Sequence, residues 1–158
     1  MIEQIKVYDI DGTIVCSQHR YRPDASGNNI DLPHWREHCT PEFIFQDTLL
    51  PMAEAYKSDL ENPSIYVIIA TARVCEENDA NYQFIAEKLG KPDMFIHRGT
   101  DDNRGGAQLK IQAIKPLLNL KQFKNAIVHV YEDNLKYMQD LCQALNAIGH
   151  YIPSKQGL

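Results

Sequence analysis

The stretch IKVYDIDGT, residues 5–13, has the pattern of an apolar strand that ends in two aspartates one residue apart. Side chains alternate along a strand with a period of two, so Asp9 and Asp11 lie on the same side if the strand continues. Two carboxylates held together repel each other unless a cation compensates, and Mg²⁺ prefers such oxygen ligands. The stretch therefore indicates a metal site at a strand end. An acidic surface turn is the alternative, because Asp-Gly is a common turn dipeptide.

Length and composition indicate a soluble globular domain. The chain has 158 residues, of which 44% are hydrophobic and 23% charged, enough for one substantial core. The longest apolar run, near Ile65 to Ala72, is too short to span a bilayer, and the first residues show no signal-peptide pattern. We therefore expect a single domain over residues 1–158, located in the cytoplasm and without a membrane partner. The net charge of −5 argues against a protein that coats nucleic acid by bulk electrostatics. The sequence does not indicate an oligomeric state.

Strands and helices are expected to alternate along the chain. The patterns predict strands over residues 4–10, 64–70, 93–97 and 126–131, with a short last strand at 151–152, and helices over 46–61, 78–89, 106–119 and 134–147. Pro116 is expected to kink or shorten the helix that contains it. The runs 64–70 and 126–131 are almost continuously apolar, which is typical of strands buried on both faces of a parallel sheet. We therefore expect an α/β fold, a Rossmann-like three-layer sandwich with a central, mainly parallel sheet. The first strand should lie at its centre, flanked by the second and the fourth.

The segment 14–45 is irregular. Pro23, Gly27, Pro33 and Pro41 interrupt any regular structure in it. A connection of this length without its own structure is usually functional or flexible. We expect an insertion above the domain, which leaves a small or absent cap.

Polar residues follow three of the predicted strands, and a lysine lies early in the third helix. Ligands of an open parallel sheet bind beyond the carboxyl ends of its strands. The residues at these positions are Asp9 and Asp11, Thr71, Glu132 and Asp133, and Lys110. Their convergence would make a site between the first and fourth strands.

In this order, the residues resemble the four motifs of the haloacid dehalogenase-like superfamily, chiefly its phosphatases. Residues 9–13 match Asp-x-Asp-Gly-Thr, residues 68–71 match an apolar strand that ends in threonine or serine, Lys110 matches the lysine motif, and residues 132–133 match the acidic pair. The resemblance covers residues 4–152 apart from 14–45. Glu132 stands where aspartate or glycine is more usual, so its side chain either approaches the metal or pairs with Lys110.

The resemblance implies a magnesium-dependent phosphomonoester hydrolase. Asp9 would attack phosphorus and form an aspartyl-phosphate, and Asp11 would act as general acid and then as general base. Asp9, the backbone carbonyl of Asp11 and Asp133 would hold Mg²⁺. Thr71 and Lys110 would bind phosphoryl oxygens. An acid at position 11 favours a phosphatase over a dehalogenase or a phosphonate-cleaving enzyme.

Basic and aromatic residues near these motifs suit a nucleotide substrate, through phosphate pairing and base stacking. Trp35 and Tyr21 are the candidates for stacking. The residues expected to contact substrate are Gly12, Thr13, Ala72, Arg73 and Arg104. The layout resembles the phosphatase domain of polynucleotide kinase-phosphatases and the small deoxyribonucleotidases, including compact phage relatives. It implies a nucleotide or a nucleic-acid end with a 3′- or 5′-phosphate.

Two other functions and one other metal stay open at this point. The substrate is alternatively a sugar phosphate or another small metabolite, and a catalytically weak phosphate-binding or regulatory module is the alternative of another class. The spacing of Cys16, His19, His34, His38 and Cys39 would offer zinc ligands, although these side chains suit contacts with substrate or solvent equally well.

Overall fold

The computed structural model describes residues 1–156, and its centre is a five-stranded parallel sheet with the strand order β5-β4-β1-β6-β7. The strands are β1 (Gln4–Tyr8), β4 (Ile65–Val74), β5 (Met94–Arg98), β6 (Ile127–Glu132) and β7 (Ile148–Tyr151). As predicted, β1 lies at the centre between β4 and β6, which are the second and fourth of the predicted strands. The α/β, Rossmann-like fold class is thereby confirmed.

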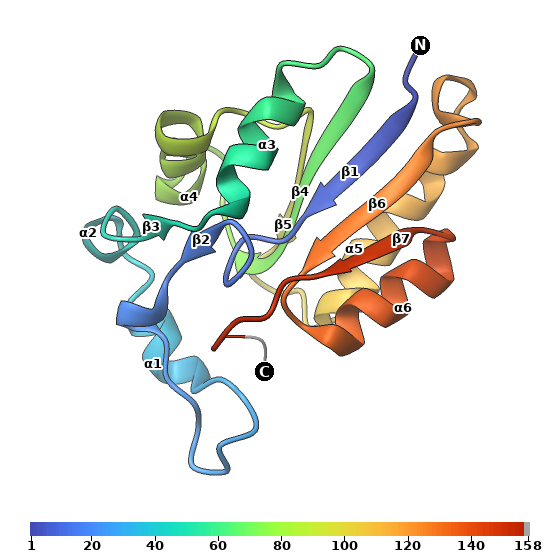
Figure 1. Ribbon diagram of the computed structural model, residues 1–158. Coiled ribbons are helices and arrows are strands. Elements are labelled where there is room, and N and C mark those ends of the chain that lie inside the picture. Colours follow the sequence, from blue (N-terminus) through green and yellow to red (C-terminus); the bar gives the residue numbers. More distant parts are fainter. Residues whose placement is uncertain (157–158) are drawn as a thin grey trace.

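Helices cover both faces of this sheet (Figure 1). One face carries α3 (Met52–Leu60) and α4 (Ala80–Phe84), which continues as a π-helical turn over Ile85–Leu89. The other carries α5 (Gly106–Ile114) and α6 (Leu135–Leu145). Neighbouring residues of β1 belong to different hydrophobic clusters. Tyr8 packs with Tyr56 and Phe84, whereas Val7 packs with Leu141. The period of two along a strand thus supplies both halves of the core.

Several element boundaries differ from the sequence prediction. The helix expected over 46–61 begins only at Met52, because residues 48–49 form the short strand β3 (Thr48–Leu49), antiparallel to β2 (Val15–Cys16). β4 continues to Val74, so Thr71 and Arg73 lie inside the strand. The last strand covers 148–151 and thus begins earlier than expected. Pro116 shortens its helix as predicted: α5 ends at Ile114 and two 3₁₀ turns follow, Lys115–Asn119 and Lys121–Phe123, because proline lacks the N–H that continues a helix.

The segment 14–45 carries more structure than the sequence predicts. Besides β2 it contains a 3₁₀ turn (Gln18–Arg20) and the short helices α1 (Leu32–Glu37) and α2 (Pro41–Ile44). Its two ends are anchored in the core, where Ile14 and Ile44 are buried with Phe84. Figure 1 shows the segment beyond the carboxyl end of β1, beside the last described residues of the chain. The segment is a small cap that packs over the carboxyl ends of the strands, where ligands of such sheets bind.

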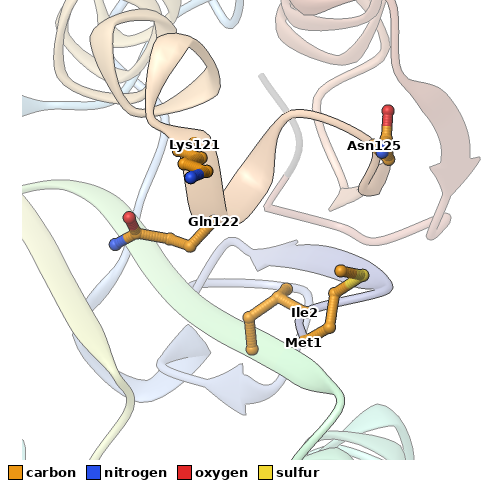
Figure 2. A pocket seen from close by; sticks show the side chains of 5 residues that line it. All are labelled: Met1, Ile2, Lys121, Gln122 and Asn125. Atoms are coloured by element: carbon orange, nitrogen blue, oxygen red, sulfur yellow. The ribbon is translucent and has the colours of Figure 1, made fainter.

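The opposite end of the sheet, where the strands begin, has a hollow of about 360 Å³. It is lined by Met1, Ile2, Lys121, Gln122 and Asn125 (Figure 2). Its lining includes residues just before β1 and β6, so it lies at the amino ends of these strands. The lining holds no carboxylate, histidine or thiol, and we assign no chemistry to it. Across residues 1–156, no helix has the length and apolar character that a membrane crossing requires.

Candidate active site

Three buried carboxylates meet at the carboxyl ends of β1 and β6. The two strands pair in parallel with Tyr8 opposite Tyr131, and the backbone N–H of Asp9 donates to the carbonyl of Tyr131 at 3.0 Å. This register places Asp9 beside Glu132 and Asp133, with one oxygen of each carboxylate within 4.8 Å of the others. The predicted meeting of Asp9 with Asp133 is therefore present. Within residues 1–156, it is the one group of three or more acidic, histidine or cysteine side chains with this spacing.

Lys110 lies against this acidic group from α5. Its Nζ is 3.0 Å from Oδ1 of Asp9 and 2.8 Å from Oε2 of Glu132, and only 1% of the residue is exposed. Burial lowers the pKa of Lys110, but the charges of Asp9 and Glu132 outweigh burial and raise it. The ammonium group therefore stays charged. Glu132, whose role the sequence left open, pairs with Lys110.

Two glycines allow the close packing around these groups. Gly12 has a φ of +81°, and a methyl group there would overlap the Asp133 carboxylate and the Ser154 hydroxyl. Gly106 begins α5, where a methyl group would come within 2.7 Å of the Tyr137 ring on α6. A glycine at position 12 satisfies both the left-handed backbone and the contact with Asp133. Gly106 lets α5 approach α6, and α5 carries Lys110.

The acidic group has the character of a site for a divalent cation. Oδ2 of Asp133 is buried and has no hydrogen-bond partner. Burial and then the charge of Glu132 raise the pKa of Asp9 well above its usual value. Burial and Glu132 raise the pKa of Asp133 to about 7. Carboxylate oxygens are the ligands that Mg²⁺ prefers, so Asp9 and Asp133 fit this cation, with Glu132 neutralised by Lys110.

We expect the metal-free protein to lose stability as the pH rises. In the folded state Asp133 holds a proton up to a pH of about 7, whereas an ordinary aspartate releases it near 3.8. Between these values the folded state binds more protons than the unfolded state, so the free energy of unfolding falls with increasing pH, by at most about 1.4 kcal/mol per unit and group. Urea unfolding in EDTA should show a lower midpoint at pH 7.5 than at pH 5.5. Added Mg²⁺ should remove most of this difference.

The matched control for this pH effect is Asp133→Asn, which cannot take up the proton. Its midpoint in EDTA should change less between the two pH values than that of the wild type. An equal change in both proteins would contradict the assignment of the effect to Asp133.

Asp11, the second aspartate of the opening stretch, is held by Arg73 and Ser17. Nε and Nη2 of Arg73 donate to its two oxygens at 2.8 and 2.6 Å, and the Ser17 hydroxyl donates to Oδ1 at 2.6 Å. Burial raises the pKa of Asp11, but the Arg73 guanidinium outweighs burial and lowers it. Asp11 is therefore a charged carboxylate in this structure.

Asp47 is a buried residue of this site that the sequence analysis missed. Arg20 donates to its two oxygens at 3.0 and 2.9 Å, Arg73 donates at 3.1 Å, and Nε2 of His19 lies 2.7 Å from Oδ1. The side chains of Arg20 and Asp47 have no exposed area. A buried charge needs a partner of opposite sign, so Asp47 holds both arginines in place beside Asp11. The sequence placed Asp47 in a helix, and it offered no sign that Arg20 is buried.

The other predicted catalytic and substrate-binding residues make hydrogen bonds within the protein. Thr13 and Thr71 are buried, and their hydroxyls bond locally, Thr13 to Oδ2 of Asp9 at 3.2 Å and Thr71 to the N–H of Arg73 at 3.1 Å. Ala72 contributes its carbonyl to Arg98 at 3.0 Å. The Arg104 side chain bonds to Asp102, in the loop before α5, and to Gln112 within α5.

The aromatic candidates lie near the charged groups of the site, and their stacking on a base stays a prediction. The Trp35 ring lies 4.2 Å from the guanidinium carbon of Arg20 and 5.9 Å from that of Arg73, so a cation already covers part of its face. The Tyr21 hydroxyl is buried without a partner. Burial and then the charge of Asp133 raise the pKa of Tyr21.

The cysteines and histidines of the segment 14–45 do not assemble as zinc ligands among residues 1–156. His19 pairs with Asp47, and Nδ1 of His38 lies 2.7 Å from the carbonyl of His34. The Cys39 thiol donates to the carbonyl of Trp35 at 3.0 Å. His38 and Cys39 thus make contacts within the cap, and His19 connects the cap to Asp47 outside it.

Comparisons with known proteins agree with this geometry. A family model described as bacteriophage T5 5′-deoxynucleotidase matches residues 1–92. A 5′-deoxynucleotidase of Escherichia phage T5 is 37% identical over 84 residues, which are 51% of this chain and 34% of that protein. The chain thus spans about a third of the length of this relative.

Solved structures share the fold at low sequence identity. A predicted phosphatase from Clostridium acetobutylicum has a TM-score of 0.68 at 16% identity, over 100% of this chain and 90% of that one. The HAD domain of the effector protein Lem4 from Legionella pneumophila has a TM-score of 0.61 at 14% identity, over 99% and 88%. A chain of the Pnkp1/Rnl/Hen1 RNA repair complex has a TM-score of 0.65 at 15% identity, over 97% and 43%. The predicted resemblance to haloacid dehalogenase-like proteins is confirmed at the level of the fold.

Proposed function

The chain belongs to the bacteriophage T5 5′-deoxynucleotidase family, and from this premise we propose that it is a magnesium-dependent phosphatase of 5′-deoxynucleoside monophosphates. The observation that carries the proposal is the buried group of Asp9, Glu132 and Asp133 with Lys110 against it. Asp9 supplies a carboxylate that can act as a nucleophile, while the other carboxylates suit a cation and Lys110 suits a phosphate.

Asp9 is the nucleophile in this proposal. Its carboxylate forms a bond to phosphorus while the bond from phosphorus to the nucleoside oxygen breaks, which splits hydrolysis into two steps. Lys110 and Thr13 each contact one oxygen of Asp9, so they fix the direction in which the carboxylate points. Lys110 also offers its charge to the phosphoryl oxygens. Asp9, Asp133 and the backbone carbonyl of Asp11 would hold Mg²⁺, which when bound screens the carboxylates from the negative phosphate and stabilises its charge in the transition state.

Asp11 is the general acid and base. It gives a proton to the departing nucleoside oxygen in the first step and takes one from the attacking water in the second. The ion pair with Arg73 favours the charged form of Asp11, so Asp11 takes up its proton when this pair loosens. A bound phosphate dianion competes for the Arg73 guanidinium, because arginine pairs with phosphate as readily as with carboxylate. Binding of the substrate phosphate thereby weakens the ion pair and lets Asp11 take up the proton that it later donates.

The test is phosphate release from a panel of substrates with Mg²⁺ or EDTA. The panel holds 5′- and 3′-deoxynucleoside monophosphates, the matching ribonucleotides, oligonucleotides with a 3′- or 5′-phosphate, a sugar phosphate and p-nitrophenyl phosphate. We expect release that depends on Mg²⁺ and is fastest with the 5′-deoxynucleotides. Faster release from an oligonucleotide end or a sugar phosphate would replace the substrate assignment. Phosphate binding without release from any compound would indicate a phosphate-binding module instead of an enzyme.

A further inference from the structure

Residues 152–156, here called the 152–156 strap, cross the carboxyl ends of the central strands after β7. The N–H of Ile152 donates to the carbonyl of Glu132 at 2.9 Å, and the N–H of Gln156 donates to the Ser154 hydroxyl at 2.9 Å. Ser154 lies so close to Gly12 that a methyl group on Gly12 would meet its hydroxyl at 2.5 Å. The strap therefore packs directly on the turn that carries Asp9 and Asp11.

The Gln156 side chain binds Ser17 through both ends of its amide. Oε1 of Gln156 accepts from the backbone N–H of Ser17 at 3.2 Å, and Nε2 donates to the Ser17 hydroxyl oxygen at 2.8 Å. Ser17 is completely buried. Its partner Gln156 lies 139 residues away in the sequence, so this contact joins the last described residues to the cap.

These bonds fix the direction of the Ser17 hydroxyl. A serine hydroxyl has one hydrogen to donate. Since its oxygen accepts from Gln156, the hydrogen is donated to Oδ1 of Asp11, 2.6 Å away. A chain of hydrogen bonds thus runs from Gln156 through Ser17 to Asp11.

We propose that Gln156 is a positioning residue, which acts through Ser17 to hold Asp11 where it protonates the leaving oxygen. The inference rests on the proposed phosphatase function. A polar contact that only stabilised the fold would affect all substrates alike. A contact that positions the acid affects substrates according to how much their leaving group needs a proton.

The test compares two leaving groups in the variant Gln156→Ala. A nucleoside alkoxide needs a proton on departure, whereas p-nitrophenolate leaves without one. General acid catalysis contributes about 10²–10⁴-fold, and partial misplacement of the acid should remove about tenfold of this. We expect the single-turnover rate of leaving-group release, which reports the first step alone, to fall about tenfold on a 5′-deoxynucleotide and to stay within about twofold on p-nitrophenyl phosphate.

Two further variants sharpen the comparison. Gln156→Glu keeps an oxygen that accepts from the Ser17 N–H, but it replaces the donating Nε2 by a second acceptor oxygen. The Ser17 hydroxyl should then donate to Glu and no longer to Asp11. Its loss on the nucleotide should be at least as large as that of Gln156→Ala. Lys155→Ala changes an exposed neighbour in the same strap and should behave as the wild type.

Equal losses of this single-turnover rate on both substrates, or no loss in Gln156→Ala, would overturn the proposal. Failure of the proposed function is recognised separately, because the wild type would then release phosphate from neither compound. In that case, amide hydrogen exchange at Ser17 still reports on the strap. Exchange should be faster in Gln156→Ala than in Lys155→Ala, and an unchanged rate would show that Gln156 does not hold Ser17.

Discussion

Replacement of Asp9 by asparagine should abolish phosphate release, with a loss on the order of 10⁴-fold or more, as expected for removal of a nucleophile that works as part of a unit. A carboxamide neither attacks phosphorus nor carries the phosphoryl group into a second step. The measurement is phosphate release from a 5′-deoxynucleotide under saturating Mg²⁺. Lys110 keeps its contact with Glu132 at 2.8 Å, so the lysine should stay in place in the variant.

The stability of Asp9→Asn separates loss of chemistry from loss of structure. The pKa of Asp9 is raised because burial and Glu132 disfavour its charge. A neutral side chain of the same shape removes that unfavourable charge, so the thermal midpoint in EDTA at pH 8 should not fall. Near-normal turnover by this variant would mean that another residue is the nucleophile.

Replacement of Asp11 by asparagine should slow release from a 5′-deoxynucleotide by about 10²–10⁴-fold, because the variant has no proton to give or take. Its affinity for Mg²⁺ should be nearly unchanged, since the expected metal contact at this position is the backbone carbonyl. Asparagine still offers one oxygen to Ser17 and Arg73, which preserves part of the local hydrogen bonding. The measurements are kcat on both leaving groups and a Mg²⁺ titration followed by thermal stability.

Loss of Mg²⁺ binding together with activity would contradict this role of Asp11. The comparison is Asp133→Asn, which should lose Mg²⁺ affinity, because Oδ2 of Asp133 is buried and has no hydrogen-bond partner in the protein. The two variants should therefore separate the acid from the metal ligand.

Much of the sheet and of its acidic site could be predicted from local patterns. The apolar runs at 64–70 and 126–131 predicted buried parallel strands, and the rule that ligands bind at the carboxyl ends of such strands placed Asp9, Asp133 and Lys110 together. Each of these inferences needs only the residues of one element and its place in the chain order.

The parts that sequence could not predict depend on contacts between distant residues. The strands β2 and β3 have two residues each, too few for a period of two to be visible. Asp47 accepts a hydrogen bond from Arg73, 26 positions away in the sequence, and Gln156 donates one to Ser17, 139 positions away. The sequence showed Arg73 as a free positive charge for substrate, whereas in the structure Asp11 and Asp47 already pair with it. Charge is visible in a sequence, but the partner of a charge is not.

The claim that Asp9 carries the phosphoryl group is tested most directly by trapping it. In Asp11→Asn with p-nitrophenyl phosphate and Mg²⁺, the first step needs no acid and the second lacks its base, so the aspartyl-phosphate should accumulate. Quenching with borohydride reduces an acyl phosphate to an alcohol and converts the aspartate to homoserine. Peptide mass spectrometry should find homoserine at position 9, and Asp9→Asn should show none. Homoserine at another aspartate, or unmodified Asp9 while p-nitrophenol is released in a burst, would contradict the mechanism.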